Sequence, residues 1–294
     1  MRPGWIEYVL LGLLATFWGA SYPLLKIALE TIPPVSLVAF RVSVAVIFLV
    51  IVMQATGQKF PRDRETWRKL AIQSCLNGFG AWTLLAWGQQ FVEASLATVL
   101  NSTAPIFVVL AGLLPFRRQA VGARAAFGAL LGLGGVILIV GTDALAGLGE
   151  AVIAQLAILA GAMLYGMAAI YGRNFSHLGP ATTAAGSMLW SSAILLPASV
   201  LIDQPWTLDI SLRSLVAASA LAFFSTALAF LLYFRLVRTL GSLGVTSQAY
   251  LRIGVGVGLG VIFLGDVITP VMGTGILAAF MGVLLINWPV RDLR

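Results

Sequence analysis

The sequence is poor in charge and almost without cysteine and histidine. Of its 294 residues, 10% are charged and 60% are hydrophobic, and the mean hydropathy is +0.97. In soluble domains about 25% of residues are charged. The low charge therefore excludes an ordinary soluble domain and indicates an integral membrane protein, with the lipid bilayer as its first partner.

The scarcity of reactive side chains excludes several kinds of site. The single cysteine, Cys75, allows neither an intramolecular disulfide nor a cysteine metal centre. The only histidine, His177, falls in a short loop, and no apolar run has an Asp or Glu near its centre. An enzyme in the membrane would need clustered acids or histidines, or a serine beside a base. We therefore expect no enzyme activity or catalytic residue, no metal and no cofactor, and the usual parts of a proton relay are missing.

Long apolar runs dominate what is present. A helix needs about 20 apolar residues to cross the hydrocarbon core, because each backbone amide must bond within its own helix. Ten runs qualify, and no connecting segment is long enough for a soluble domain. The predicted spans are Trp5–Leu29, Pro34–Gln54, Trp67–Gly88, Ala94–Phe116, Arg124–Gly141, Glu150–Gly172, Pro180–Ile202, Arg213–Phe234, Gly241–Leu264 and Val267–Trp288. The predicted fold is all-α with ten transmembrane helices.

The distribution of charge predicts the orientation. A net charge of +7 would point to nucleic acid in a soluble protein, but here most basic residues lie in short gaps between apolar runs, as in cytoplasmic loops. With a cytoplasmic N-terminus, the inside segments hold 14 of the 18 basic residues and the outside segments mostly acids. The inside residues are Arg2, Lys59, Arg62, Arg64, Arg68, Lys69, Arg117, Arg118, Arg124, Arg173, Arg235, Arg238, Arg291 and Arg294. We expect both termini in the cytoplasm, a multi-pass protein of the cell inner membrane, and no nucleic-acid partner.

The second half of the chain repeats the first at a constant offset of 147 residues. Gly135–Ile139 aligns with Gly282–Ile286, for example, and similar matches run through the whole repeat. The predicted domains are residues 1–147 and 148–294, with five spans each. Because five is odd, the second copy enters the membrane in the opposite sense, and inverted repeats place a substrate site near the midplane between the copies. The sequence thus predicts two inverted five-helix repeats around a central cavity, in a transporter that acts as a monomer.

Short motifs carry a family resemblance. They are Phe17–Lys26, Ile32-Pro33-Pro34 followed by Phe40-Arg41, Ala94–Leu100 and Phe263–Asp266. These segments resemble the EamA-type domains of the drug/metabolite transporter (DMT) superfamily, whose usual plan is two tandem units with ten spans. Within that superfamily the chain most resembles exporters of the YddG type, which implies export of amino acids and related small metabolites.

The resemblance implies that the first, third, fourth, sixth, eighth and ninth spans line the cavity. Residues near the middle of these spans are aromatic, amide-bearing or hydroxyl-bearing, with almost no acid. Such a lining can hold a zwitterion, because amides and hydroxyls bond its charged groups and aromatic faces attract its ammonium. The predicted substrate-binding residues are Trp18, Ser21, Tyr22, Asn77, Gly78, Trp82, Asn101, Ser102, Pro105, Tyr165, Phe224, Ser225, Gln248, Tyr250 and Arg252.

Each of these residues also has a structural explanation. The tryptophans can pack against neighbouring helices, and the two tyrosines inside the spans can bond to them. Asn77 and Asn101 are more telling, because an amide facing lipid is costly, yet interhelical hydrogen bonds would satisfy them too. Pro105 is expected to bend its helix and free a carbonyl.

Some basic residues lie within the spans or at their ends, where they need an explanation. Arg252 is near the centre of the ninth, where an unpaired charge costs about 3 kcal/mol on insertion scales, so it either anchors a carboxylate or bonds freed carbonyls. Arg41 is near the outer start of the second span and is predicted to snorkel or to hold a helix end. Lys26 and its counterpart Arg173 sit at span ends, as gating contacts or interfacial anchors.

Small residues mark the fifth and tenth spans. Gly128 and Gly132 in the fifth, and Gly275, Ala279 and Gly282 in the tenth, have the spacing that lets helices approach closely. We predict that these residues serve packing and that the two spans lie at the rim of the molecule.

The function predicted from the sequence is secondary transport. The substrates are small amphipathic metabolites, amino acids first, exported across the cytoplasmic membrane by alternating access. The alternative within transport is a carrier of phosphorylated or other anionic metabolites that uses Arg252 and Lys26, although a dianionic group usually takes two or more cations. The alternative from a different class, a membrane-embedded enzyme, lacks the residues that it would need.

Overall fold

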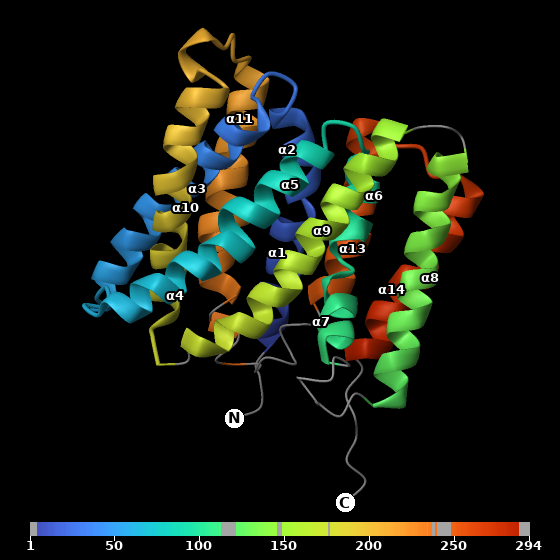
Figure 1. Cartoon of the computed structure of the whole chain (residues 1–294), viewed down its shortest axis with the longest axis horizontal. Helices are drawn as coiled ribbons and strands as arrows, with labels where there is room; N and C mark the ends of the chain where they lie inside the picture. Colours follow the sequence, from blue (N-terminus) through green and yellow to red (C-terminus); the bar gives the residue numbers. More distant parts are fainter. Residues whose placement is uncertain are drawn as a thin grey trace, which may run out of the picture.

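A computed structural model describes residues 5–112, 122–145, 149–175, 177–233, 235–236, 239 and 248–287. In this part of the chain the regular structure is entirely helical (Figure 1). The helices of the first half are α1 (Trp5–Gly19), α2 (Ser21–Ala28), α3 (Pro34–Ala55), α4 (Arg64–Ser74), η1 (Cys75–Phe79), α5 (Gly80–Gly88), α6 (Ala94–Asn101), α7 (Ala104–Gly112) and α8 (Ala123–Leu145). The others are α9 (Gly149–Tyr171), η3 (Gly172–Phe175), α10 (Pro180–Ile202), η4 (Pro205–Thr207), α11 (Leu212–Ala222), η5 (Phe223–Leu228), α13 (Gln248–Leu259), η6 (Gly260–Leu264) and α14 (Pro270–Asn287).

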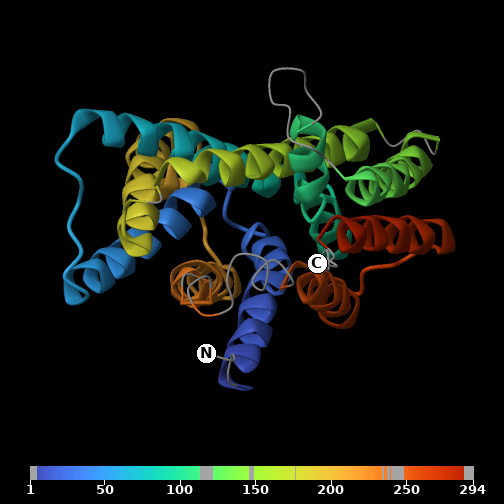
Figure 2. The ribbon, with the colours of Figure 1, turned by 90° about the horizontal axis from the view of Figure 1, so that it is seen from below.

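The helices form a bundle with a packed pair at one edge. α8 and α14 lie side by side at that edge, and α3, α4 and α10 lie at the opposite edge, with α1, α2, α11 and α13 between them (Figures 1 and 2). α1 begins and α14 ends toward the same end of the bundle (Figure 1). The opposite end, called the upper end from its place in Figure 1, carries the loops at residues 29–33, 89–93, 203–211 and 265–269.

Several helices have the length and composition of membrane spans. Within the described residues, six segments are long and apolar enough to cross a bilayer, and three more apolar helices are shorter. The six are Trp5–Ala28, Pro34–Ala55, Ala94–Ala111, Gly149–Ala168, Pro180–Ile202 and Leu212–Tyr233. The shorter three are Ala123–Leu138, Leu251–Leu264 and Pro270–Ile286. The chain is therefore a multi-pass membrane protein, and the number of ten spans stays a prediction.

The predicted runs are interrupted where the sequence weakens the helical hydrogen bonds. The first run divides between α1 and α2, just before Pro23, whose nitrogen cannot bond to the preceding turn. The fourth divides between α6 and α7, just before Pro105, as the proline predicts. At that break the hydroxyls of Ser102 and Thr103 donate to the carbonyls of Thr98 and Leu100, at 2.7 and 2.6 Å. The two hydroxyls at the break therefore bond back to the last turn of α6.

A wide helical turn occurs in each half of the chain. η1 lies between α4 and α5, and η5 continues α11, and both are π-helical. At the offset of 147 residues, η1 corresponds to residues 222–226, which overlap η5. π turns inside α-helices are rare overall, but many of those known lie at functional sites. The two copies therefore share an irregularity as well as a pattern of apolar residues.

The packing of α8 against α14 depends on glycine. A Cβ on Gly282 would lie 2.5 Å from the carbonyl oxygen of Gly128 and 2.6 Å from the nitrogen of Gly132. A Cβ on Gly135 would lie 2.5 Å from the carbonyl oxygen of Gly275. Only glycine lets two backbones come this close. The packing role predicted for these small residues is confirmed.

At the upper end, hydrogen bonds connect the two halves of the chain. Asp203, after α10, accepts from the backbone N–H of Ser36 in the first turn of α3 at 2.7 Å. Asp266, after η6, accepts from the N–H of Ser95 in the first turn of α6 at the same distance. Both carboxylates satisfy free amides at a helix N-terminus, and both lie near its positive end. Each aspartate therefore caps a helix of the other half.

Replacing Asp266 with alanine is expected to destabilise the folded protein by about 1–2 kcal/mol, the usual effect of losing an N-cap. For a chain of this size that corresponds to a fall of about 2–6 °C in the unfolding midpoint. The measurement is thermal unfolding in detergent. Asp209→Ala, in an exposed stretch of the same end, is the matched control and should leave the midpoint unchanged. Equal shifts in the two variants would show that the cap has no specific role.

Candidate functional site

Polar side chains from several helices meet inside the bundle. The members share burial or partial burial, and each bonds to another member or packs against the hydrophobic core that surrounds them. We call this group the interior polar cluster: Tyr22, Arg41, Trp82, Asn101, Ser102, Tyr165, Thr226 and Arg252. The cluster draws on α2, α3, α5, α6, α9, η5 and α13, and on residues just beyond α6.

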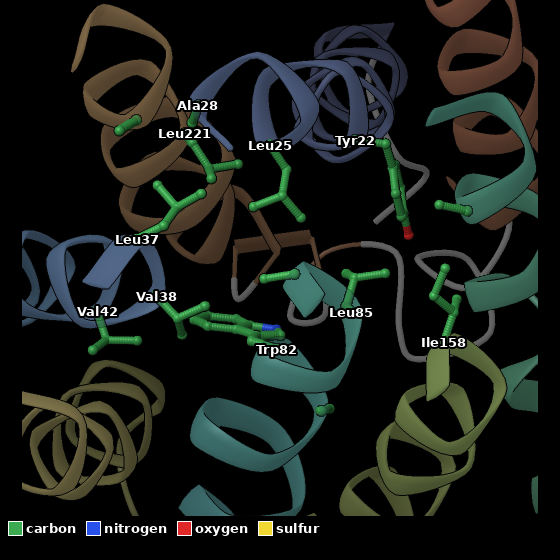
Figure 3. Packing of buried hydrophobic residues seen from close by; sticks show 14 of the residues in the cluster. Tyr22, Leu25, Ala28, Leu37, Val38, Val42, Trp82, Leu85, Ile158 and Leu221 are labelled. Atoms are coloured by element: carbon green, nitrogen blue, oxygen red, sulfur yellow. The ribbon is translucent and has the colours of Figure 1, made fainter. Parts of the chain in front are cut away.

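Arg41 is the most buried charge of the cluster. Only 6% of its surface is exposed, and its guanidinium carbon lies 4.0 Å from the centre of the Trp82 ring, a cation–π contact. Trp82 reaches from α5 toward Val38 of α3 in Figure 3. The prediction that Arg41 snorkels or holds a helix end is wrong. Its position is seven residues into α3, about 10 Å along the axis, and neighbouring helices cover it there.

Thr226 holds the Arg41 side chain. The Nε of Arg41 donates to the hydroxyl oxygen of Thr226 at 2.7 Å. That hydroxyl in turn donates to the carbonyl of Leu221 at 3.0 Å, five residues earlier in the chain. Thr226 lies in the wide turn η5, and the turn therefore orients the acceptor that fixes Arg41.

Arg252 joins α13 to the break between α6 and α7. Its Nη2 donates to the hydroxyl oxygen of Ser102 at 3.0 Å, and Ser102 donates to the carbonyl of Thr98. Its Nε is buried and has no hydrogen-bond partner among the described residues. α13 also lies close to α1, because a Cβ on Gly19 would lie 3.0 Å from the Arg252 carbonyl oxygen. One donor of the guanidinium thus remains unused inside the protein.

Asn101 and Tyr22 form a buried pair. The amide nitrogen of Asn101 donates to the Tyr22 hydroxyl at 2.7 Å, and Gln89 donates to the Tyr22 carbonyl at 3.1 Å. Tyr22 is 2% exposed, and in Figure 3 its hydroxyl points away from α2. The amide oxygen of Asn101 is buried and has no partner among the described residues. The pair therefore keeps a free acceptor.

Tyr165 of α9 packs against the main hydrophobic core, which includes Tyr22 and Trp82. The two arginines lie in the interior beside this core. In the part of the chain that the structure describes, neither Arg41 nor Arg252 pairs with a carboxylate. The ion pairs found there are Lys69–Glu65, Arg213–Glu30 and Arg235–Glu7. Two positive charges therefore share the interior of the bundle, and the described residues offer neither of them a carboxylate partner.

The structure brings six of the predicted site residues together and leaves others apart. Tyr22, Trp82, Asn101, Ser102, Tyr165 and Arg252 belong to the cluster. Trp18 packs on Phe230 and Tyr233 instead, with ring centres 6.3 and 5.5 Å away. Phe224 is 44% exposed and contacts Phe17 and Phe223.

The other predicted site residues make local contacts, or carry a buried polar atom that has no hydrogen-bond partner among the described residues. The hydroxyl of Ser21 donates to the Trp18 carbonyl, and Gly78 packs against Ser191 of α10, which a Cβ would overlap. Pro105 is in the first turn of α7. Buried oxygens without a partner among the described residues belong to Asn77, Ser225 and Gln248. The side chain of Tyr250 lies outside the described residues.

Lys26 is engaged in holding a helix end. Its Nζ donates to the carbonyls of Gln89, Gln90 and Val92 at 2.7, 3.3 and 2.9 Å, at and beyond the C-terminus of α5. Cations are favourable at this negative end of a helix. Lys26 is therefore not free to bind an anion together with Arg252, as the alternative function required. The side chain of Arg173, its counterpart, lies outside the described residues.

Two members of the cluster were not predicted as site residues. The sequence did mark Arg41 as unusual, since it is a charge inside an apolar run. Its burial could not be predicted, because burial depends on the helices packed around it. Thr226 carried no such mark, because a threonine in a span resembles any other until the wide turn is known. Among the described residues no group of three or more His, Cys, Asp or Glu could hold a metal ion.

Known proteins resemble this chain over most of its length. The model of the EamA-like transporter family matches residues 5–141 and 152–288. YoaV of Bacillus subtilis (strain 168), named an uncharacterized transporter, is 25% identical over 198 residues, 66% of this chain and 68% of YoaV. YedA of Escherichia coli (strain K12), named an uncharacterized inner membrane transporter, is 26% identical over 258 residues, 86% of this chain and 81% of YedA. One crystal structure shares the fold with a TM-score of 0.68 at 18% identity, covering 97% of this chain and 98% of that one.

Proposed function

The chain belongs to the EamA-like transporter family, in the DMT superfamily, and from this premise we propose that it exports small amphipathic metabolites, amino acids first, by alternating access. It is a membrane transporter by family, so the proposal concerns substrate, direction and mechanism. The observation that carries it is the pair of interior arginines, Arg41 and Arg252, without a carboxylate partner among the described residues. A buried charge without a partner is costly, and a substrate carboxylate would supply the missing charge.

Equivalent contacts in the two halves support an inverted repeat. At the offset of 147 residues, α4 corresponds to α11, α7 to α13, α3 to α10, and α1 with α2 to α9. α4 packs against α10 as α11 packs against α3, and α7 packs against α9 as α13 packs against α1. An exchange of contacts between such halves is the usual basis of alternating access around a central site. The domains at 1–147 and 148–294 and the cytoplasmic termini belong to this proposal.

The test is counterflow in proteoliposomes. Purified protein, loaded with unlabelled amino acid, should accumulate labelled threonine, methionine, glutamine or an aromatic amino acid, and should prefer the L-enantiomer. Protein-free liposomes and the Arg252→Ala protein are the controls. Absence of stereospecific exchange for all of these compounds would end the amino-acid proposal.

A second candidate is a carrier of anions with two negative charges. Arg41 supplies the second cation that such a group usually requires and that Lys26 does not provide. Phosphorylated and dicarboxylate compounds therefore belong in the same counterflow panel. Exchange of these compounds without exchange of amino acids would favour this candidate.

A further inference from the structure

Among the described residues the amide oxygen of Asn101 is a buried acceptor without a partner, and the neighbouring residue contacts an arginine with a buried donor without a partner. Asn101 is 4% exposed, and its amide nitrogen is committed to the Tyr22 hydroxyl, which fixes the side chain and leaves the oxygen unpaired among the described residues. The next residue, Ser102, accepts from Arg252, whose Nε is also unpaired. An unpaired buried polar atom destabilises the protein, so both atoms favour a ligand that pairs with them.

The packing of α6 against α13 brings Ser102, the residue after Asn101, into contact with Arg252. A Cβ on Gly256 would lie 2.5 Å from Thr98, and one turn further Ser102 contacts Arg252, so the two helices run antiparallel. Gln248 is one turn from Arg252 on the same face of α13, and its buried amide oxygen is unpaired among the described residues. At the offset of 147 residues Gln248 is the counterpart of Asn101. Each half thus contributes an amide acceptor close in the chain to the Arg252–Ser102 contact, Asn101 beside Ser102 and Gln248 one turn from Arg252.

We infer that Asn101 determines substrate selectivity by accepting a hydrogen bond from the ammonium group of an α-amino acid whose carboxylate binds Arg252. The inference rests on the proposed function. An ammonium has three N–H donors, which suits two amide acceptors better than a hydroxyl with one. Arg41 and Arg252 repel an ammonium and by themselves prefer a simple anion. The Asn101 oxygen therefore decides whether a zwitterion can compete with a carboxylate that lacks the amino group.

The expected preference for an amino acid over its des-amino carboxylate is large, because binding of the des-amino compound leaves a buried acceptor unpaired. A site built to bond a substrate N–H rejects the compound that lacks it, since its own acceptor stays buried and unpaired. We expect the wild-type protein to prefer an amino acid over its des-amino carboxylate by about 50-fold in transport efficiency, within the range of one such penalty. The 2-hydroxy acid of the same side chain should fall between them.

The test compares these three carboxylates in counterflow for the wild type, Asn101→Leu, Asn101→Asp and Gln73→Leu. Asn101→Leu should bring the preference for the amino acid down toward one, because one of the two amide acceptors is gone while both arginines, which repel an ammonium, remain. Asn101→Asp keeps an acceptor and should retain the preference or increase it. Gln73, whose amide oxygen is likewise buried and unpaired but lies on α4, is the matched control, and its variant should keep the wild-type preference.

The preference ratio separates selectivity from folding. If Asn101→Leu slows all three compounds equally, Asn101 has only a structural role and the inference is wrong, while the proposed function stands. If Asn101→Leu does not fold, Asn101→Asp decides: loss of the amino-acid preference there overturns the inference. If the wild type exchanges the hydroxy acid as well as the amino acid, the ammonium assignment is wrong. If it exchanges none of the three carboxylates, the proposed function and the inference fail together.

Discussion

Arg252→Ala is expected to lower the efficiency of carboxylate transport by about 100-fold. Hydrogen bonds to charged groups contribute about 1.5–3 kcal/mol each, and 1.4 kcal/mol corresponds to a factor of ten. The structural cost should be small, because Ser102 loses an acceptor role and no donor is left unpaired: its own hydroxyl already donates to Thr98. The measurement is initial counterflow rate against substrate concentration in proteoliposomes with matched protein content.

Two variants make this result interpretable. Arg252→Lys keeps the charge but not the planar fork, and should retain about a tenth of the wild-type efficiency. Arg213→Ala removes an arginine at the exposed start of α11, outside the interior polar cluster, and should transport within about twofold of the wild type. Carboxylate transport by Arg252→Ala within threefold of wild type, in correctly folded protein, would exclude the anchor role.

Gly282→Val is expected to prevent stable packing of α8 against α14. The three nearest neighbours of a Cβ at this position are all backbone, namely the Gly128 oxygen and the nitrogen and Cα of Gly132, and backbone cannot rotate away as a side chain can. The helices would have to separate, at a cost of about 3 kcal/mol at the upper end of the overpacking range. This cost corresponds to a fall of about 10 °C in the unfolding midpoint, or to loss of monodisperse protein.

The matched control for this variant is Gly134→Val on α8. A Cβ at Gly134 meets nothing within 4 Å, and the residue is exposed, so the same change of residue type should leave the midpoint within about 2 °C. Size-exclusion chromatography and thermal unfolding in one detergent compare the two. A similar fall in both variants would mean that valine itself, rather than the close approach of the helices, destabilises the protein.

The packing of the rim was predictable from the sequence because it depends on one residue type at regular spacing. Glycines three and four positions apart identify a close helix contact without knowledge of the rest of the fold. The break before Pro105 was predictable for a similar reason, since proline removes a specific hydrogen bond. For Arg252, the sequence predicted that a partner exists but not which residue it is. A charge at that depth requires a partner, but nothing in the sequence points to Ser102.

The location of Arg41 could not be read from the sequence because it depends on neighbours that are distant in the chain. A residue seven positions into a span can snorkel if the helix faces lipid, and α3 at that position faces α5 and η5 instead. The same limit applies to Trp18 of α1, whose ring packs on the rings of Phe230 and Tyr233 in the second half of the chain. Spacing along a helix gives depth, whereas burial depends on the other helices.

The two wide turns have a consequence for helical phase. Each extra residue in a helix advances the chain by about 100° around the axis, so positions beyond η1 and η5 face another direction than regular counting assigns. Asn77 and Phe224 lie inside these turns, and a helical wheel drawn through either span gives them the wrong neighbours. The same shift occurs at overlapping positions of the two halves, so regular counting misplaces the side chains beyond η1 and beyond η5 alike. At η5 the angular offset determines which side chain reaches the neighbouring helix, and the hydroxyl that it turns toward Arg41 is that of Thr226.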